Sequence, residues 1–193
     1  MKKNKTLVTI SHYNKRNKNN LIQLIKSLKN LNYDLFIVIN DDNCSFEKNK
    51  VFQNIKTLIR PNTGMNIGSW NSSYLYNRNF DFYIFVQDEC KILNIDFVKN
   101  YVFELSKNDV GITGESINYK WANKWENIAN SSLNYIVGYN AIKRPVYRVQ
   151  YYLSLMKKWG IEPGLTGLHL RSLVWGFKRE VLEKLFPFPL GKT

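Results

Sequence analysis

The chain of 193 residues has only two cysteines and two histidines. These are the residues that form disulfides and that bind metal ions through sulfur or imidazole nitrogen. Two cysteines exclude a disulfide-rich scaffold and a zinc site built from cysteines. No apolar run approaches the roughly 18 residues needed to cross a membrane. The basic start of the chain precedes only a short apolar run, Leu7 to Ile10, which does not fit a signal peptide. We therefore expect a cytoplasmic protein.

Acidic residues are also scarce: 15 Asp and Glu stand against 28 Lys and Arg, for a net charge of +13. A hydrophobic content of 44% and an aromatic content of 15% nevertheless exclude a disordered chain. The excess is uneven, because residues 51–110 are balanced whereas residues 111–193 carry 12 basic and 5 acidic groups. A basic surface attracts nucleic acid, anionic lipid headgroups or nucleotide phosphates. Alternatively, the positive charge serves only to keep the protein in solution.

Short apolar runs alternate along the chain with segments of helical periodicity. The runs lie at 7–10, 35–39, 55–59, 82–86 and 110–113, and the periodic segments at 21–31, 67–75 and 95–105. Such short runs are typical of buried strands, and strands joined by helices make right-handed βαβ units. The pattern predicts an α/β fold, a Rossmann-like three-layer α/β/α sandwich with an open, mostly parallel sheet.

The alternation stops after Gly114, and residues 115–144 predict a long loop rich in Asn, Trp and Tyr. Pro145 fits the first turn of a helix that ends near Lys158. A last strand at 172–177 and a last helix at 179–185 complete the expected elements. The length favours one domain, 1–193, with one half at 1–113 and the other at 114–193.

Polar residues follow almost every predicted strand. In an open parallel sheet these positions meet at one edge, where ligands bind. They are His12, Tyr13 and Asn14 after the first strand, Asp41 and Asp42 after the second, Arg60, Asn62 and Gly64 after the third, Asp88 and Glu89 after the fourth, and Glu115 after the fifth. This concentration predicts a small-molecule site along the edge.

Two acidic pairs at these strand ends, Asp41-Asp42 and Asp88-Glu89, each have two interpretations. The first pair fits a turn, and the second fits a helix cap. Alternatively, one pair contacts a nucleoside and the other binds Mg²⁺ or Mn²⁺, which prefer carboxylate oxygens. Neither a Walker A motif nor a G-x-G-x-x-G motif follows the first strand. Cys44 and Cys90, which follow the two pairs, are expected to be buried thiols.

Several motifs occur in one order along the chain. They are Thr9-Ile-Ser-His-Tyr-Asn14, Ile37-Val-Ile-Asn-Asp-Asp42, Asn62-Thr-Gly64 with Asn66-Ile-Gly-Ser-Trp70, and His169-Leu-Arg-Ser172 with Gly176-Phe-Lys-Arg-Glu180. Together they resemble a GT-A glycosyltransferase of the family 2 kind, closest to the rhamnan-synthesis-type transferases. Gln87-Asp88-Glu89 stands where that family has its Asp-x-Asp metal motif, with Gln at the first acidic position.

The resemblance implies transfer of a sugar from a nucleotide-sugar donor to a hydroxyl of a glycan or lipid-linked acceptor in cell-surface polysaccharide synthesis. It assigns donor binding to the half at 1–113, through the polar residues that follow the first three strands and through Asn66, and acceptor binding to the half at 114–193. It also implies a divalent cation held by Asp88 and Glu89, with His169 as a third candidate ligand. The Glu-Asp pair that supplies the family's catalytic base does not occur before Thr193, so the base lies elsewhere, or the chain is truncated, or the protein does not catalyse transfer. Glu115 and then Glu162 are the candidate bases within the chain.

Two other classes of function stay open. The missing base fits a non-catalytic partner subunit of another transferase. The alternation of Tyr119, Trp121 and Trp125 with Lys120 and Lys124 fits a module that binds single-stranded nucleic acid. Acidic pairs at the ligand edge would repel nucleic-acid phosphates, so we expect no nucleic-acid partner.

A basic cluster near the predicted helix at 145–158 suggests one more partner. Arg144, Arg148, Lys157 and Lys158 lie among aromatic and aliphatic residues. This mixture fits peripheral contact with an anionic membrane at its cytoplasmic face.

Overall fold

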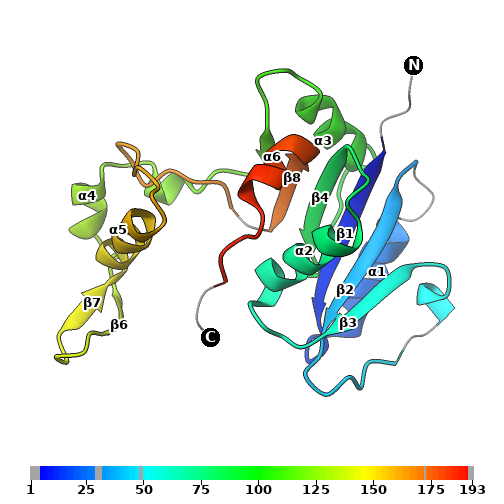
Figure 1. Cartoon of the computed structure of the whole chain (residues 1–193), viewed down its shortest axis with the longest axis horizontal. Helices are drawn as coiled ribbons and strands as arrows, with labels where there is room; N and C mark the ends of the chain where they lie inside the picture. Colours follow the sequence, from blue (N-terminus) through cyan, green and yellow to red (C-terminus); the bar gives the residue numbers. More distant parts are fainter. Residues whose placement is uncertain (1–4, 29–31, 48–49, 172, 191–193) are drawn as a thin grey trace. The chain divides into compact units, whose positions relative to one another are not determined.

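The computed structural model describes residues 5–28, 32–47, 50–171 and 173–190. These residues form two compact units (Figure 1). Unit 1 contains the described residues up to Glu115 and those from Leu173 onward, and unit 2 is Ser116–Arg171. The expected division at 113/114 lies near the start of unit 2, but residues 173–190 belong with unit 1. That the whole chain makes one domain stays a prediction, and the end of the predicted helix at 21–31 and Ser172 lie outside the described residues.

Unit 1 is built on a six-stranded sheet with the strand order β3-β2-β1-β4-β8-β5. The strands are β1 (Thr6–Tyr13), β2 (Asp34–Asn40), β3 (Lys56–Arg60), β4 (Phe82–Gln87), β5 (Ile112–Gly114) and β8 (Val174–Lys178). The helices are α1 (Lys18–Leu28), α2 (Met65–Tyr76), α3 (Phe97–Leu105) and α6 (Arg179–Leu185), with a 3-10 turn at Lys50–Phe52. β1, β2, β3 and β4 pair in parallel, whereas β8 runs antiparallel to β4 and β5. The predicted α/β fold with a mostly parallel sheet is confirmed.

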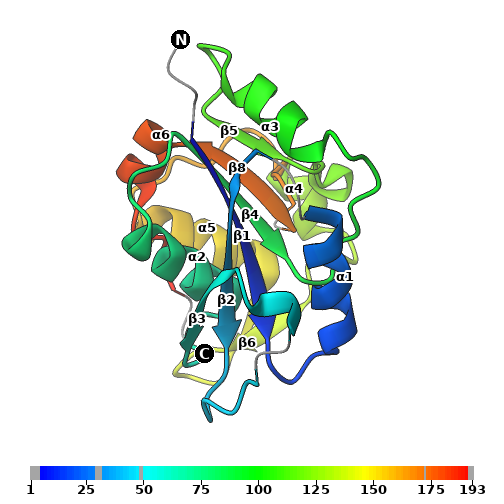
Figure 2. The same cartoon turned by 90° about the vertical axis from the view of Figure 1, so that its right-hand side faces the viewer.

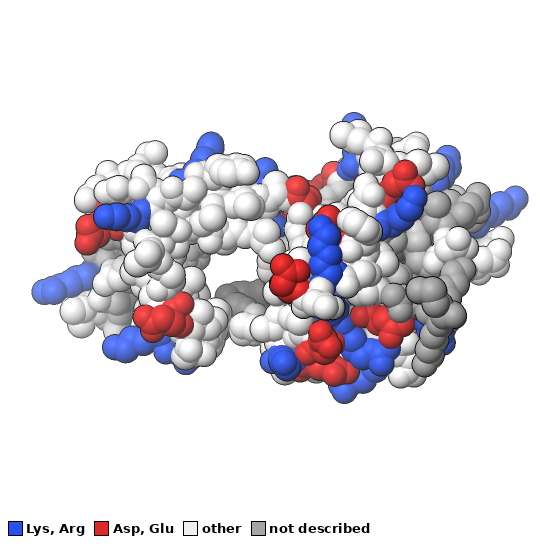
Figure 3. All heavy atoms as spheres, turned by 90° about the horizontal axis from the view of Figure 1, so that it is seen from above, with Lys and Arg blue, Asp and Glu red and all other residues white. Residues whose placement is uncertain are grey.

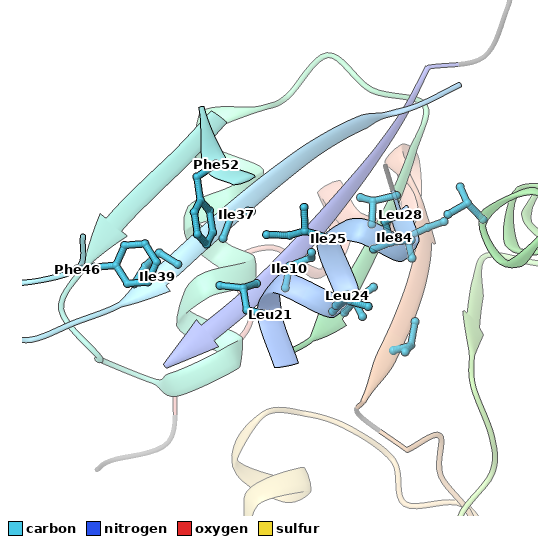
Figure 4. Packing of buried hydrophobic residues seen from close by; sticks show 14 residues of the cluster. Ile10, Leu21, Leu24, Ile25, Leu28, Ile37, Ile39, Phe46, Phe52 and Ile84 are labelled. Atoms are coloured by element: carbon cyan, nitrogen blue, oxygen red, sulfur yellow. The ribbon is translucent and has the colours of Figure 1, made fainter. Parts of the chain in front are cut away.

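Helices cover both faces of this sheet (Figure 2). On one face Ile10 and Ile37 pack against the apolar stripe of α1 (Figure 4). On the other face Val38 packs in a cluster with Trp70 of α2 and Leu182 of α6. Successive side chains of a strand point to opposite faces, so a strand buried on both faces must be apolar throughout. The continuous apolar runs of the sequence are therefore the direct signal of this layer structure.

Unit 2 has regular structure where a long loop was expected, so that prediction is wrong. It contains a 3-10 turn at Tyr119–Trp121, α4 (Trp125–Ala129), β6 (Ile136–Tyr139), β7 (Pro145–Tyr147) and α5 (Arg148–Lys158). β6 and β7 pair as an antiparallel hairpin. Pro145 consequently lies in a strand, and the predicted helix begins at Arg148 instead. No helix in the described ranges is both long and apolar enough to cross a membrane.

The core of unit 2 contains residues that the sequence placed on its surface. Trp121 is 2% exposed and clusters with Ile128 and Val149. The guanidinium of Arg148 lies over the ring of Trp121 at 4.7 Å, and also over two tyrosine rings, Tyr135 and Tyr152. A buried Trp121 has no face free for a nucleobase, and Arg148 is enclosed by aromatic rings. Neither residue serves the surface role that its sequence neighbourhood suggested.

Candidate functional site

The carboxyl ends of β1, β2 and β4 lie side by side, because β1 pairs in parallel with both neighbours. Alternate residues of a strand face opposite sides of the sheet. His12, Asp41 and Asp88 therefore continue the face that packs on α1, whereas Ser11 and Asn40 continue the face that packs on α2. The single site expected at this edge is thus two polar clusters, one on each face.

The first cluster centres on Asp88, whose side chain is 4% exposed. Nδ1–H of the fully buried His12 donates to Asp88 Oδ2 at 2.5 Å. Arg16 Nη1 donates to Asp88 Oδ1 at 3.2 Å and to Glu89 Oε2 at 2.8 Å. The Arg16 side chain is 40% exposed, so its guanidinium links a buried carboxylate to the surface. Nε2 of His12 has no hydrogen-bond partner among the described residues, and the ring lies edge-on to Phe46.

Asp41 and Asp42 both serve the backbone of the loops around them. The Asp41 carboxylate is buried and accepts N–H bonds from Asn43 at 3.1 Å and Phe46 at 2.8 Å. Burial by itself raises the pKa of Asp41, but the hydrogen bonds outweigh it and hold the pKa below its ordinary value. Asp42 is exposed, and its Oδ1 accepts the backbone N–H of Asn62 at 2.7 Å. The turn interpretation therefore describes this pair, and only Asp42 presents its carboxylate to solvent.

The second cluster is a hydrogen-bond network that ties β1, β2 and β3 to α2. Arg60 Nη1 donates to Asn40 Oδ1 at 2.6 Å, and Asn40 Nδ2 donates to Ser69 Oγ at 2.7 Å. Ser11 Oγ donates to Asn66 Oδ1 at 2.8 Å. Burial lowers the pKa of Arg60. Arg60 and Asn66, both predicted to contact the donor, are here engaged in holding α2 on the sheet.

Two glycines allow the loop before α2 to approach Arg60 closely. Gly64 has a φ of +73°, which favours glycine. A Cβ added to Gly68 would lie 2.0 Å from the carbonyl oxygen of Thr63 and 2.9 Å from the Arg60 guanidinium. Arg60 Nη2 donates to that same carbonyl at 2.8 Å. The glycines that resembled a donor-binding motif thus shape the start of the helix.

A cavity of about 640 Å³ lies beside the first cluster, lined by the loop after β4, by α3 and by the start of β8. Two acids reach it, Glu89 and Glu115, and Glu115 Oε2 accepts the backbone N–H of Val174 at 3.1 Å. The Tyr101 hydroxyl in its wall has no hydrogen-bond partner among the described residues. Burial raises the pKa of the Cys90 thiol to about 11. The cavity combines an apolar wall with carboxylates, as a site for a partly apolar hydroxyl compound requires.

His169 and Glu162, the two predicted site residues of unit 2, do not belong to either polar cluster of the sheet edge. Asn118 Nδ2 donates to His169 Nε2 at 3.2 Å, and His169 Nδ1–H donates to the carbonyl oxygen of Gly167 at 2.8 Å. Both ring nitrogens of His169 are therefore satisfied. Glu162 is exposed, and no ion pair joins it to another described residue.

The first cluster, as it stands, does not fit a divalent cation. Mg²⁺ and Mn²⁺ need several oxygen ligands at once. Both oxygens of Asp88, and one of Glu89, already accept hydrogen bonds from His12 and Arg16. Across 5–28, 32–47, 50–171 and 173–190, no three His, Cys, Asp or Glu side chains gather as metal ligands. The predicted set of Asp88, Glu89 and His169 is not brought together.

Arg16 is the member of the site that sequence analysis missed. It lies two residues beyond the strand-end positions 12–14, and its charge is opposite to that of Asp88 and Glu89. The strand-end rule stops at position 14, and nothing in the local sequence separates Arg16 from its neighbour Lys15. Cys44, expected to be buried, is exposed, because it lies in the surface loop that Asp41 organises.

Comparison with models of protein families and with curated protein sequences finds no match. Solved structures do match. The mannosyltransferase PcManGT from Pyrobaculum calidifontis, in complex with GDP-Man and Mn²⁺, is 10% identical with a TM-score of 0.56, over 98% of this chain and 49% of that one. A cytidylyltransferase from Leptospira borgpetersenii is 11% identical with a TM-score of 0.52, over 97% of this chain and 66% of that one.

A third match is CMP:2-keto-3-deoxy-manno-octonic acid synthetase in complex with CTP, 11% identical with a TM-score of 0.50, over 98% of this chain and 80% of that one. At such identities the similarity establishes the fold alone, a GT-A-like α/β fold with a mostly parallel sheet. The chain spans about half the length of the mannosyltransferase.

Proposed function

We propose that the chain binds a nucleotide sugar at the carboxyl edge of the unit 1 sheet and transfers the sugar to a hydroxyl group. One observation carries the proposal: the Arg16 guanidinium is held at the surface by Asp88 and Glu89, beside a cavity that Glu115 also reaches. The likeness to a mannosyltransferase that binds GDP-Man supports the donor class. The sequence motifs resemble those of rhamnan-synthesis-type transferases, so the proposed acceptor is a glycan or lipid-linked glycan of cell-surface polysaccharide.

Arg16 takes the role of binding the donor's diphosphate. Only Nη1 of its guanidinium is used in hydrogen bonds to described residues. The other N–H groups of its planar fork match the geometry of phosphate oxygens. When the bond between sugar and diphosphate breaks, negative charge grows on the leaving group, and a fixed guanidinium stabilises it. This charge is supplied by the chain itself, so the proposal routes no step through a divalent cation.

The nucleoside is assigned to the more open part of the edge. Tyr13 and Asn14, at the end of β1, are half-buried. Asp42 follows the neighbouring strand β2, and its carboxylate accepts the backbone N–H of Asn62, which follows β3. The fully buried His12 is instead a positioning residue, since it fixes Asp88, which in turn fixes Arg16. Asp41 and Arg60 likewise build the loops rather than meet the donor.

Glu115 is the proposed base for the acceptor, with Glu162 as the second candidate. The acceptor hydroxyl oxygen bonds to the anomeric carbon, the bond from that carbon to the diphosphate oxygen breaks, and the hydroxyl proton passes to Glu115. The bond from Val174 N–H to Oε2 fixes this carboxylate at the cavity. The buried hydroxyl of Tyr101, which has no hydrogen-bond partner among the described residues, lies in the wall of the same cavity.

Calorimetry of the full chain with UDP, GDP and CDP, each in chelator and in Mn²⁺, tests the proposal. We expect one of the three to bind in chelator. Arg16→Met should weaken that binding at least tenfold, because a charge-assisted hydrogen bond to phosphate contributes about 1.5–3 kcal/mol. Lys26→Met, which removes an exposed charge in the last turn of α1, is the matched control and should bind like the parent.

The outcomes separate the candidate functions. No binding of any diphosphate in either condition contradicts the proposal. Binding that appears only in Mn²⁺ would leave the transferase standing and overturn the role of Arg16. Diphosphate binding without release of sugar from the matching nucleotide sugar would favour the non-catalytic partner. Release of pyrophosphate from CTP would favour nucleotidyl transfer, the chemistry suggested by the names of two fold neighbours.

A further inference from the structure

The β6–β7 hairpin of unit 2 exposes an apolar face. The register pairs Ile136 with Tyr147, and Tyr139 with Pro145. Paired residues share a face of a sheet, and Pro145 and Tyr147 are two positions apart on β7, so these four side chains lie on one side. An irregularity in the register between Ile136 and Gly138 allows Ile136 and Tyr139, three positions apart, to share that side. All four are exposed, whereas Gly138 and its partner Val146, on the other side, are half-buried. A hairpin with one buried face normally has a polar outer face, and this one does not.

The turn of the hairpin adds an exposed aliphatic tip and two cations. Ile142 is 69% exposed. The turn is ordered by Asn140, whose Oδ1 accepts the backbone N–H groups of Ile142 at 3.1 Å and Arg144 at 2.9 Å. Lys143 and Arg144 are exposed and form no ion pair with any described residue. Figure 1 shows this turn at the end of the hairpin that lies farthest from α5.

The surrounding sequence carries charge of one sign. Residues 127–161 contain five Lys and Arg residues and no Asp or Glu. Figure 3 shows charged side chains of both signs scattered over a mostly uncharged face of unit 2, at the left, and the hairpin lies on the opposite side of this unit. The exposed tyrosines and isoleucine are suited to an apolar region, and the unpaired cations beside them are suited to negative charge. A surface with anionic groups outside and apolar groups just beneath complements both.

We propose that the hairpin surface, defined as Ile136, Tyr139, Ile142, Lys143, Arg144 and Tyr147, docks unit 2 on an anionic lipid bilayer. Lys143 and Arg144 meet the headgroup charge, while Ile142 and the tyrosine rings enter the interface. Nucleic acid fits less well, because exposed isoleucines add nothing to phosphate binding and Trp121 is buried. The enclosed Arg148 takes no part. This proposal does not depend on the proposed transfer reaction.

Co-sedimentation of the full chain with vesicles tests the docking. The vesicles are phosphatidylglycerol with phosphatidylcholine in equal amounts, and phosphatidylcholine alone, each at low and high salt. We expect binding to the anionic vesicles at low salt and its loss at high salt. Lys143→Glu with Arg144→Glu should weaken binding by at least about 25-fold, since each cation near such a surface contributes roughly fivefold. Tyr139→Ser with Ile142→Ser should also weaken it.

Lys26→Glu with Lys99→Glu is the matched control. It lowers the net charge of +13 by the same amount as the hairpin double reversal, but at exposed positions of unit 1, and should bind like the parent. Equal losses from control and hairpin variants would overturn the proposal, as would no binding to anionic vesicles. An oligonucleotide bound in a manner sensitive to the hairpin charges but not to Tyr139 and Ile142 would reassign the surface to nucleic acid. A dimer lost on Tyr139→Ser would reassign it to a second copy.

Discussion

The two units handle charge in opposite ways. Every ion pair found among the described residues lies in unit 1. Unit 2 carries eight Lys and Arg residues against two acids, and its exposed Lys143 and Arg144 form no ion pair with a described residue. In unit 1 the pairs place Arg16 at a defined point of the sheet edge, whereas in unit 2 one cation is enclosed by rings and others face solvent. Paired charge builds a site for one ligand, and unpaired charge of one sign suits an extended anionic surface.

The cores differ as much as the charges. Unit 1 has a buried cluster on each face of its sheet, while the cluster of unit 2 has three buried residues at its centre. A small core backed by a two-stranded hairpin is close to the lower limit of independent stability. We therefore expect the two units to respond separately when each loses its central tryptophan.

Removing those tryptophans should give the largest effects. Trp70, 0% exposed, has its ring centroid 5.5 Å from that of Phe85, and Trp121 is 2% exposed. Trp70→Ala and Trp121→Ala should each cost about 3–5 kcal/mol, because a large cavity is left behind. In amide hydrogen exchange, Trp121→Ala should remove protection within 116–171 and leave β1 protected. Loss of protection in β1 to the same extent would show that the units unfold together.

A methyl group at Gly68 should act next in size. Its Cβ would lie 2.0 Å from the Thr63 carbonyl oxygen, so the loop or α2 must move. Gly68→Ala should lower the free energy of unfolding in urea by about 1–3 kcal/mol, as overpacking does. Gly138→Ala is the matched control in unit 2, since nothing lies within 4 Å of the added Cβ. If the two substitutions had equal costs, the close approach at Gly68 would be refuted.

Arg148 and Arg144 test what the aromatic enclosure contributes. The Arg148 guanidinium lies over three rings and its Nε donates to the Tyr152 hydroxyl at 3.1 Å. Arg148→Met should destabilise by about 1–2 kcal/mol, because cation–π contacts and a hydrogen bond are lost. Arg144→Met, at an exposed position, should change stability by less than about 0.5 kcal/mol. Thermal unfolding of both variants measures these changes in stability. A larger loss of stability in Arg144→Met than in Arg148→Met would contradict the structure.

The smallest expected effect is a difference between Cys44 and Cys90 in their rate of alkylation, with no change in stability. Burial raises the pKa of Cys90 to about 11, so little reactive thiolate exists at pH 8, and the fraction grows as the pH rises toward 11. Cys44 is exposed. Mass spectrometry after iodoacetamide treatment should find Cys44 alkylated at least tenfold faster at pH 8. Cys90 reacting as fast as Cys44 would mean that the cavity beside Glu115 is more open than the structure indicates.

Prediction from the sequence succeeded where burial alone dictates the pattern. The runs at 35–39 and 82–86 are apolar because both faces of β2 and β4 are covered, and the helix at 179–185 was placed correctly. It failed for the β6–β7 hairpin, whose strands are short, expose one apolar face and are joined through the Asn140 turn. Such a hairpin has neither the alternation of a half-buried strand nor a two-residue turn motif.

The sequence by itself determined the sheet and the edge at which polar residues collect, because burial on two faces requires uninterrupted apolar runs and polar residues can only follow them. Only the tertiary structure decided what those polar residues do. A strand alternates its faces with a period of two, so neighbours such as Ser11 and His12 enter different clusters. Arg16 and Asp88 are 72 positions apart in the sequence and meet because they follow β1 and β4, which pair in the sheet. No local sequence pattern encodes that pairing.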